Sequence, residues 1–219
     1  MEKQELEALA SQLGHPSGEK GSEIATMMHE TNIGMTKNAI SNLHLTGGNS
    51  ILELGHGNAG HVAFLFSQVT ELHYTGLEIS TLMHAEALQT NQSFVDSGKA
   101  SFLLYDGETM PFEANSFHKA FTVNTLYFWK DPAALLSELS RILVPAARFS
   151  LTFAHRSFME TLPFTQYGFT LYNPDEVLKL TEHSAFRLKH EDLQTETVLA
   201  KDGRQVSRSF STLVFENAK

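Results

Sequence analysis

Segment 51–60, ILELGHGNAG, decides the fold, because an apolar run leads there into three closely spaced glycines. The apolar residues 51–54 predict a buried strand, and the residues that follow Gly60 predict a helix. Glycines in such a turn allow a tight backbone and let a ligand approach the main chain at the positive end of the helix. The segment therefore predicts a strand, a ligand-binding loop and a helix in that order.

Strand and helix patterns continue to alternate away from this segment. Strands are expected at 50–54, 72–78, 101–105, 120–124 and 149–154, with helices at 59–70, 81–97 and 132–143. Asp131 is expected to cap the helix at 132–143, and another helix is expected to start after Asn173, where Glu176 is placed to close a capping box. Two β-rich runs, 186–198 and 205–215, are joined by an Asp-Gly turn at 201–204. This order predicts a doubly wound α/β fold, whose mostly parallel seven-stranded sheet has one antiparallel strand and helices on both faces.

Residues 1–45 precede the alternation and are expected to form an N-terminal helical cap on a main domain of residues 46–219. A helix is predicted at 2–13, followed by a Gly/Pro/Ser break at 14–18. From Ser22 onward apolar residues recur at helical spacing, but Asn32 and Gly34 interrupt them, so one helix and two helical pieces are equally expected. Because about 45 residues are too few for an independent core, we expect the cap to pack over the ligand site.

The composition narrows the functional class. None of the 219 residues is cysteine, which excludes disulfides, thiolate metal sites and a thiol nucleophile. The eleven histidines show no metal-ligand spacing, so no metal site is expected. A net charge of −9 argues against a nucleic-acid partner, and no apolar run approaches the ~20 residues of a membrane span. The charged first residues lack a signal or transit pattern, which predicts a cytoplasmic protein.

Three acidic residues follow successive predicted strands. Glu53 lies two residues before Gly55, Glu78 ends the second strand, and Asp106 follows the third. The glycine pattern with Glu78 also suits a nicotinamide dehydrogenase, but Glu53 would repel a pyrophosphate. Carboxylates at these places suit a cationic nucleoside, with Glu78 accepting ribose hydroxyls and Asp106 accepting from an adenine amino group.

These segments, in order, resemble the class I S-adenosylmethionine-dependent methyltransferase family, in particular its small-molecule branch of ubiquinone-biosynthesis methyltransferases. The similar segments are 53–60, 77–80, 106–112, 116–121 and 141–145, within about residues 50 to 155. The resemblance implies S-adenosyl-L-methionine as cofactor and methyl transfer to a small-molecule acceptor. It also implies that the cofactor is contacted by Glu53, Gly55, Gly57, Glu78, Ile79, Asp106, Gly107 and Asn124.

Two positions depart from the family pattern. Ala146 and Ala147 stand where the family usually has two glycines, so a positive φ there would be costly. We expect that turn at the end of the sheet opposite to the ligand. His56 is unusual inside the glycine loop, and we expect it to be an exposed loop residue.

Candidate acceptor-binding residues follow the fourth and fifth strands. Tyr127, Trp129 and His155 are expected to form a wall of the acceptor site, and His155 is a possible general base. The aromatic-rich stretch 158–172 predicts a packed loop near an apolar acceptor. Two alternatives stay open: a non-catalytic module that binds S-adenosylmethionine, and an NAD-dependent oxidoreductase.

Overall fold

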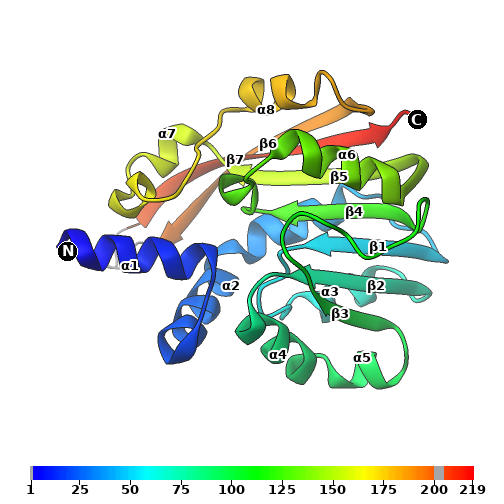
Figure 1. Cartoon of the computed structure of the whole chain (residues 1–219), viewed down its shortest axis with the longest axis horizontal. Coiled ribbons are helices and arrows are strands. Elements are labelled where there is room, and N and C mark those ends of the chain that lie inside the picture. The colour runs from blue at the N-terminus through cyan, green and yellow to red at the C-terminus, as the bar shows by residue number, and fades with distance from the viewer. Residues whose placement is uncertain (1, 200–204) are drawn as a thin grey trace.

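The strands of the chain form one seven-stranded sheet in the order β3-β2-β1-β4-β5-β7-β6 (Figure 1). The computed structural model describes residues 2–199 and 205–219. Its strands are β1 (Asn49–Leu54), β2 (Leu72–Glu78), β3 (Ala100–Leu104), β4 (Phe117–Val123), β5 (Leu143–Ala154), β6 (Phe186–Leu199) and β7 (Gln205–Asn217). The described pairs among β1 to β5 are parallel, whereas β7 runs antiparallel to both of its neighbours, β5 and β6. The predicted fold class is therefore confirmed, while the Asp-Gly turn predicted at 201–204 lies outside the described residues.

Helices cover both faces of the sheet. They are α1 (Lys3–Gly14), α2 (Gly18–Ser41), α3 (Val62–Gln68), α4 (Thr81–Thr90), α5 (Gln92–Asp96), α6 (Pro132–Ile142), α7 (Arg156–Met159) and α8 (Pro174–Thr181), with short 3-10 turns η1 (Leu126–Phe128) and η2 (Pro163–Gln166). Side chains alternate across β1, so Ile51 packs with α3 and α4 while Leu52 packs with α6 and α8. Burial on both faces explains why consecutive residues of β1, such as Ile51 and Leu52, are both apolar.

Local sequence signals set the ends of several helices. Asp131 caps α6 by accepting the N–H of Ala134 at 3.0 Å, and Pro132 occupies the first helical position. Asn173 and Glu176 form the predicted capping box of α8. The helix predicted at 81–97 is divided into α4 and α5 at Asn91, whose side chain donates to the carbonyl oxygens of Ala59 and Ala87.

The fifth strand begins earlier than the sequence predicts. Helix α6 ends at Ile142, and β5 starts at Leu143 instead of Phe149. A bulge in its pairing with β4 contains Ala146, which has a φ of 60°. An L-residue in this left-handed region costs about 1–2 kcal/mol, a strain that the bulge accommodates without glycine. Ala146 precedes the shared run of β4 and β5, at the end away from the carboxyl ends of the strands.

Helix α2 is one continuous helix, so the two-piece alternative is wrong. A Cβ atom at Gly34 would stand 2.5 Å from Oε2 of Glu196 in β6, and the glycine thus gives room to this carboxylate. The second half of α2 docks on the sheet through Met35, Ala39 and Ile40, which are fully buried. Helix α1 lies on the side toward which β1 and β4 point (Figure 1). None of the described helices has the length and apolarity that a bilayer-crossing segment requires.

Candidate functional site

A cavity of about 560 Å³ opens at the carboxyl ends of β1 to β4. Its floor consists of the loops that follow these strands, and its other walls come from α2, η1 and residues 13–16, which are the end of α1 and the start of the α1–α2 connection. The lining contains all eight residues that the family resemblance assigns to the cofactor, which are Glu53, Gly55, Gly57, Glu78, Ile79, Asp106, Gly107 and Asn124. Residues that are up to 71 positions apart in sequence thus meet at one edge of the sheet, where ligands bind in doubly wound folds.

Two residues of the glycine loop adopt a backbone conformation that favours glycine over other residues. Gly55 and Gly57 have φ angles of 70° and 56°, in the left-handed region. A Cβ at Gly55 would collide with Cγ2 of Thr125, so the loop following β4 packs directly on this residue. At Gly57 a Cβ would meet nothing within 4 Å, so the main chain there faces open cavity. A ligand can therefore reach the backbone at Gly57.

The Glu78 carboxylate joins the glycine loop to the end of β2. Its Oε2 accepts the N–H of Gly57 at 3.0 Å, and its Oε1 accepts those of Ile79 at 2.8 Å and Ser80 at 3.0 Å. The residue is 5% exposed, yet it borders the cavity. These three bonds fix both oxygens and leave one lone pair, on Oε2, free for a hydroxyl donor.

Glu53 is held in a buried polar cluster beneath the loop. Its Oε2 accepts the phenol of Tyr74 at 2.5 Å and contacts Nε2 of His61 at 2.7 Å. Burial, reinforced by the Glu53 carboxylate, raises the pKa of Tyr74 far above its usual value, so the phenol remains a donor. The cluster connects β1, β2 and the start of α3, and it presents a negative group to the cavity.

Asp106 is an exposed residue at the cavity edge. Its Oδ1 accepts the backbone N–H groups of Thr109 at 2.7 Å and Glu108 at 2.8 Å. These bonds lower the pKa of Asp106, so its carboxyl group is ionised at neutral pH. Its remaining oxygen suits a donor such as an aromatic amino group.

His56 is buried, which contradicts the exposed position predicted for it. It is 4% exposed and stacks edge-on against Phe102, with the ring centroids 5.0 Å apart. Its Nδ1 lies 2.7 Å from the carbonyl oxygen of Gly57, an atom that only accepts, so Nδ1 carries the proton. Nε2 has no partner among the described residues. The room for this ring comes from Gly76, where a Cβ would lie 2.5 Å from it.

The three predicted acceptor-site residues differ in position. Trp129 lines the cavity, and its Nε1 donates to Thr125 Oγ1 at 3.1 Å. Tyr127 lies behind the lining, where it donates to Asn124 Oδ1 at 3.0 Å and to the Ala154 carbonyl at 2.9 Å. His155 also lies outside the lining, with Nε2 2.8 Å from Ser211 Oγ. The cavity therefore brings together Trp129 and the cofactor candidates, but not Tyr127 or His155.

One face of α2 contributes lining residues, of which the sequence indicated only Met28 as packing against the main domain or a ligand. They are Ala25, Met28, His29, Asn32 and Thr36, at helical spacing. The ring of His29 covers Gly60, where a Cβ would come within 2.9 Å of it. Burial, together with nearby His61, lowers the pKa of His29, which keeps the imidazole neutral at pH 7. Helical periodicity indicated a buried face of α2, but which residues meet the cavity depends on how the helix docks.

Comparison with known proteins agrees with this geometry. Residues 52–151 match the model of the methyltransferase domain family. Residues 52–151, which are 100 of the 219 residues, therefore resemble a methyltransferase domain. The match covers β1 to β5 and the loops that bear the three acids, and it confirms the methyltransferase prediction at the level of the domain.

Two relatives and two structures illustrate the similarity. An O-methyltransferase of Pyrenophora dematioidea is 28% identical over 117 residues, 53% of this chain and 43% of that protein. The O-methyltransferase resE of Aspergillus sclerotiorum is 27% identical over 136 residues, 62% of this chain and 49% of that protein. This chain thus spans about half the length of these relatives.

Among solved structures, one similar chain comes from the complex of the Haloferax volcanii Trm112 methyltransferase activator with a putative methyltransferase. It has a TM-score of 0.74 and 16% identity, with 98% of both chains covered. Geranyl diphosphate C-methyltransferase of Streptomyces coelicolor A3(2), in complex with S-adenosyl-L-homocysteine, has a TM-score of 0.72 and 12% identity, with 95% of this chain and 84% of that chain covered. At these identities the similarity concerns the fold.

Proposed function

We propose that this chain is an S-adenosylmethionine-dependent methyltransferase that methylates a hydroxyl oxygen of an apolar small molecule. The observation that carries the proposal is the meeting of the glycine loop and three carboxylates in one cavity that also has an apolar wall. The match to a methyltransferase domain and the O-methyltransferases among the relatives support the reaction. The motifs similar to ubiquinone-biosynthesis methyltransferases support a small-molecule acceptor.

The donor set of the cavity fits the cofactor. S-adenosylmethionine carries an ammonium and a sulfonium, and three carboxylates around the cavity favour such a cation over a dinucleotide. Glu78 would accept a ribose hydroxyl through Oε2 and Asp106 the adenine amino group, while Glu53 would favour the cationic methionine end. Gly55 and Gly57 would contact the cofactor through their main-chain atoms. Ile79, Gly107 and Asn124 would form the rest of the contact surface. The bound cofactor supplies an electrophilic methyl group on sulfur.

The rest of the lining suits an apolar acceptor. Met28, Phe128 and Trp129 supply apolar and aromatic surface on α2 and η1. The protein's part in methyl transfer is to align the acceptor and to exclude water. Oxygen methylation also needs a group that takes the hydroxyl proton. We assign this step to a ring nitrogen of His29, because His29 lines the cavity in its neutral form, whereas His155 lies outside the lining.

The same proposal gives residues 1–45 the role of a cap on a domain of residues 46–219. The α1–α2 connection and the cavity face of α2 both line the site. The carbonyl oxygen of Pro16 accepts the Ser80 hydroxyl at 2.6 Å, next to the Glu78 carboxylate. The cap therefore contacts the segment that would hold the ribose.

Two measurements test the proposed function. Calorimetric titration with S-adenosylhomocysteine and with NAD is expected to show binding of the first and none of the second; the opposite result would establish the oxidoreductase alternative. A methyl-transfer screen with phenols, amines and carboxylates is then expected to detect methylated phenols. Binding of S-adenosylhomocysteine without transfer to any acceptor class would support the non-catalytic module. Replacement of His29 by Gln should lower kcat for a phenol at pH 7 and leave the Kd of S-adenosylhomocysteine within about twofold.

A further inference from the structure

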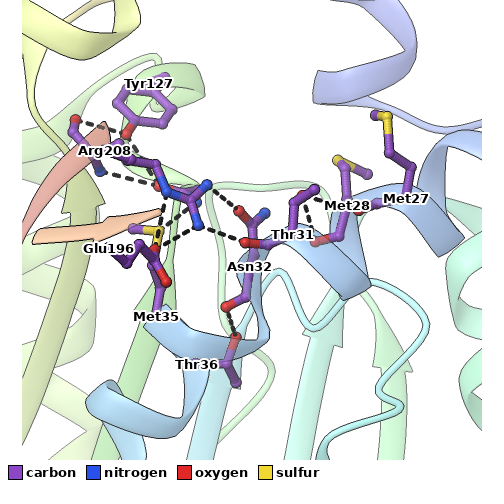
Figure 2. A network of polar contacts seen from close by, with 11 residues as sticks. Met27, Met28, Thr31, Asn32, Met35, Thr36, Tyr127, Glu196 and Arg208 are labelled. Atoms are coloured by element: carbon purple, nitrogen blue, oxygen red, sulfur yellow. Dashed lines mark hydrogen bonds and ion pairs between the residues drawn. The ribbon is translucent and has the colours of Figure 1, made fainter. Parts of the chain in front are cut away.

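A buried arginine of the terminal hairpin binds the helix that lines the cavity (Figure 2). Arg208 of β7 is 6% exposed. Its Nε and Nη2 donate to Oε1 of Glu196 in β6, at 3.0 and 2.7 Å. Its Nη2 also donates to the main-chain oxygen of Thr31 at 2.5 Å, and its Nη1 donates to Oδ1 of Asn32 at 3.0 Å. One guanidinium thus holds the hairpin and two consecutive residues of α2.

The chemistry of arginine fixes the orientation of the Asn32 amide. A guanidinium has only donors, so the atom facing Arg208 must be the amide oxygen. The Nδ2 group of Asn32 therefore points away from Arg208, as Figure 2 shows. Because Asn32 lines the cavity, this group is a hydrogen-bond donor available to a ligand there.

The surroundings of Asn32 balance the charge of Arg208 and hold the Asn32 amide in a fixed position. Glu196 compensates the charge of Arg208, and the absence of a side chain at Gly34 leaves room for the Glu196 carboxylate. Thr36 donates to the main-chain oxygen of Asn32 at 3.2 Å. An ion pair with a 7% exposed arginine side chain is costly to bury, and a purely mechanical link between hairpin and helix would not require one.

The other amide in this part of the lining already has partners. Asn124 accepts from Tyr127 and from the Ala154 N–H through Oδ1, and its Nδ2 lies 3.4 Å from Met35 Sδ. Asn32 Nδ2 makes no hydrogen bond to any described residue. Its neighbours along the cavity face of α2 are Met28, His29 and Thr36.

We propose that Arg208 is a positioning residue that turns the Asn32 amide so that Nδ2–H binds an acceptor-only oxygen, such as a carbonyl, of the methyl acceptor. This inference rests on the proposed methyltransferase function and specifies its substrate class as an oxygenated, largely apolar hydroxy compound. A site built around a buried donor discriminates against analogues that lack the matching oxygen, because the donor is then left unpaired.

The test compares hydroxyacetophenones with ethylphenols, in which a methylene replaces the carbonyl group. The 2-, 3- and 4-isomers of each are titrated into the full chain saturated with S-adenosylhomocysteine. For the best isomer pair we expect the wild-type chain to bind the carbonyl compound about 3- to 10-fold more tightly. Asn32→Asp keeps an oxygen for Arg208 but replaces the donor by a second acceptor, so the preference should vanish or reverse.

Two further variants separate positioning from a structural role. Arg208→Lys keeps the charge next to Glu196 but loses the planar fork that holds Thr31 and Asn32 together, so the preference should decrease. Asn38→Ala is the matched control, because Asn38 links α2 to the hairpin through Asp192 at 2.8 Å and Thr212 at 2.5 Å, outside the cavity lining. It should keep the wild-type preference.

The outcomes distinguish this inference from the proposed function. If Asn32→Asp keeps the wild-type preference, if Asn38→Ala loses it equally, or if no carbonyl compound binds more tightly than its partner, the inference is overturned. If the wild-type chain does not bind S-adenosylhomocysteine, the proposed function itself fails. Thermal unfolding of every variant identifies any that is not folded. If another variant is unfolded, the ligand preference of Asn32→Asp, which preserves the Arg208 contact, decides whether the inference holds.

Discussion

The carboxylate of Glu78 accepts the main-chain N–H of Gly57 at 3.0 Å, across 21 positions of the sequence. The bond fastens the glycine loop after β1 to the acidic end of β2. The acid therefore has two roles in the proposed site: it orders the loop before the cofactor arrives, and it offers an oxygen to the ribose. A substitution at Glu78 should affect both.

Replacement of Glu78 by Ala is expected to weaken binding of S-adenosylhomocysteine about 10- to 100-fold, because a charge-assisted hydrogen bond is worth roughly 1.5–3 kcal/mol. Glu78→Gln should also lose affinity, since its amide NH₂ would have to face the N–H of Gly57 or those of Ile79 and Ser80. Calorimetric titration measures both variants. Glu182→Ala, at an exposed position after α8, is the control. Wild-type affinity in a folded Glu78→Ala variant would refute the ribose assignment.

Replacement of Gly55 by Ala is expected to destabilise the loop for two reasons. The φ of 70° disfavours an L-residue by about 1–2 kcal/mol, and the new Cβ would collide with Cγ2 of Thr125. The double variant Gly55→Ala/Thr125→Ser removes that methyl group and keeps the hydroxyl that contacts Thr122 and Trp129. Urea unfolding should show partial recovery of stability in the double variant. Equal stability of the single variant and the wild type would contradict the described packing.

Local sequence patterns predict much of the fold. The apolar strands, the glycine loop and the caps at Asp131 and Asn173 depend on neighbours within about four residues, and the sequence predicted them. The three acids were predictable as a set because the carboxyl ends of parallel strands meet at one edge. Ala146 shows the limit, because its bulge depends on the register between β4 and β5 and not on its own sequence.

The misjudged positions involve contacts between distant segments. His56 is buried because Gly76, on another strand, leaves room for its ring. Gly34 suggested a break in the helix, whereas it accommodates Glu196, 162 residues further along the chain. Tyr127 was placed in the acceptor wall, but its hydroxyl reaches the Ala154 carbonyl and holds it behind the lining. His29 and Asn32 became candidates only when the docking of α2 was known.

The buried His56 predicts a loss of stability at mildly acidic pH. Burial lowers the pKa of His56 below the usual 6.5, so the unfolded chain binds this proton more readily than the folded chain. The contribution of neutral His56 to the free energy of unfolding is therefore fully present above pH 6.5 and is lost as the pH falls below that value. His56→Asn keeps a donor for the Gly57 carbonyl and cannot titrate, so its unfolding free energy should fall less between pH 7 and pH 5.5.

Urea unfolding at both pH values measures this difference, with His183→Asn, at an exposed position, as the control. The chosen range lies above the usual pKa values of Asp and Glu, which keeps carboxyl titration small. The other histidines with lowered pKa values, His29, His44 and His155, continue to titrate in every variant, so only part of the pH dependence should disappear. An unchanged dependence in His56→Asn would show that this ring is not the titrating group.

The proposed cap predicts that ligand binding protects one part of the N-terminal region and not another. The second half of α2 is fixed to the hairpin, through Arg208 at Thr31 and Asn32 and through Asp192 at Asn38. Amide hydrogens of residues 31–41 should therefore exchange slowly with or without S-adenosylhomocysteine.

Residues 14–29 carry most of the cap's cavity-lining residues and make fewer side-chain hydrogen bonds to the main domain. Their side-chain links are the Ser80 hydroxyl on Pro16 at 2.6 Å and the hydroxyl of Ser22 on Glu86 at 2.5 Å. A ligand that fills the cavity beneath Ala25 and His29 adds contacts to this less firmly fixed segment, so its amide exchange should slow on binding. Hydrogen exchange measured by mass spectrometry on peptides from 14–29 and 31–41 decides the question. Equal exchange of 14–29 in both states, with S-adenosylhomocysteine bound, would mean that the cap is a permanently docked shield, because a segment that already holds its final contacts gains none from the ligand.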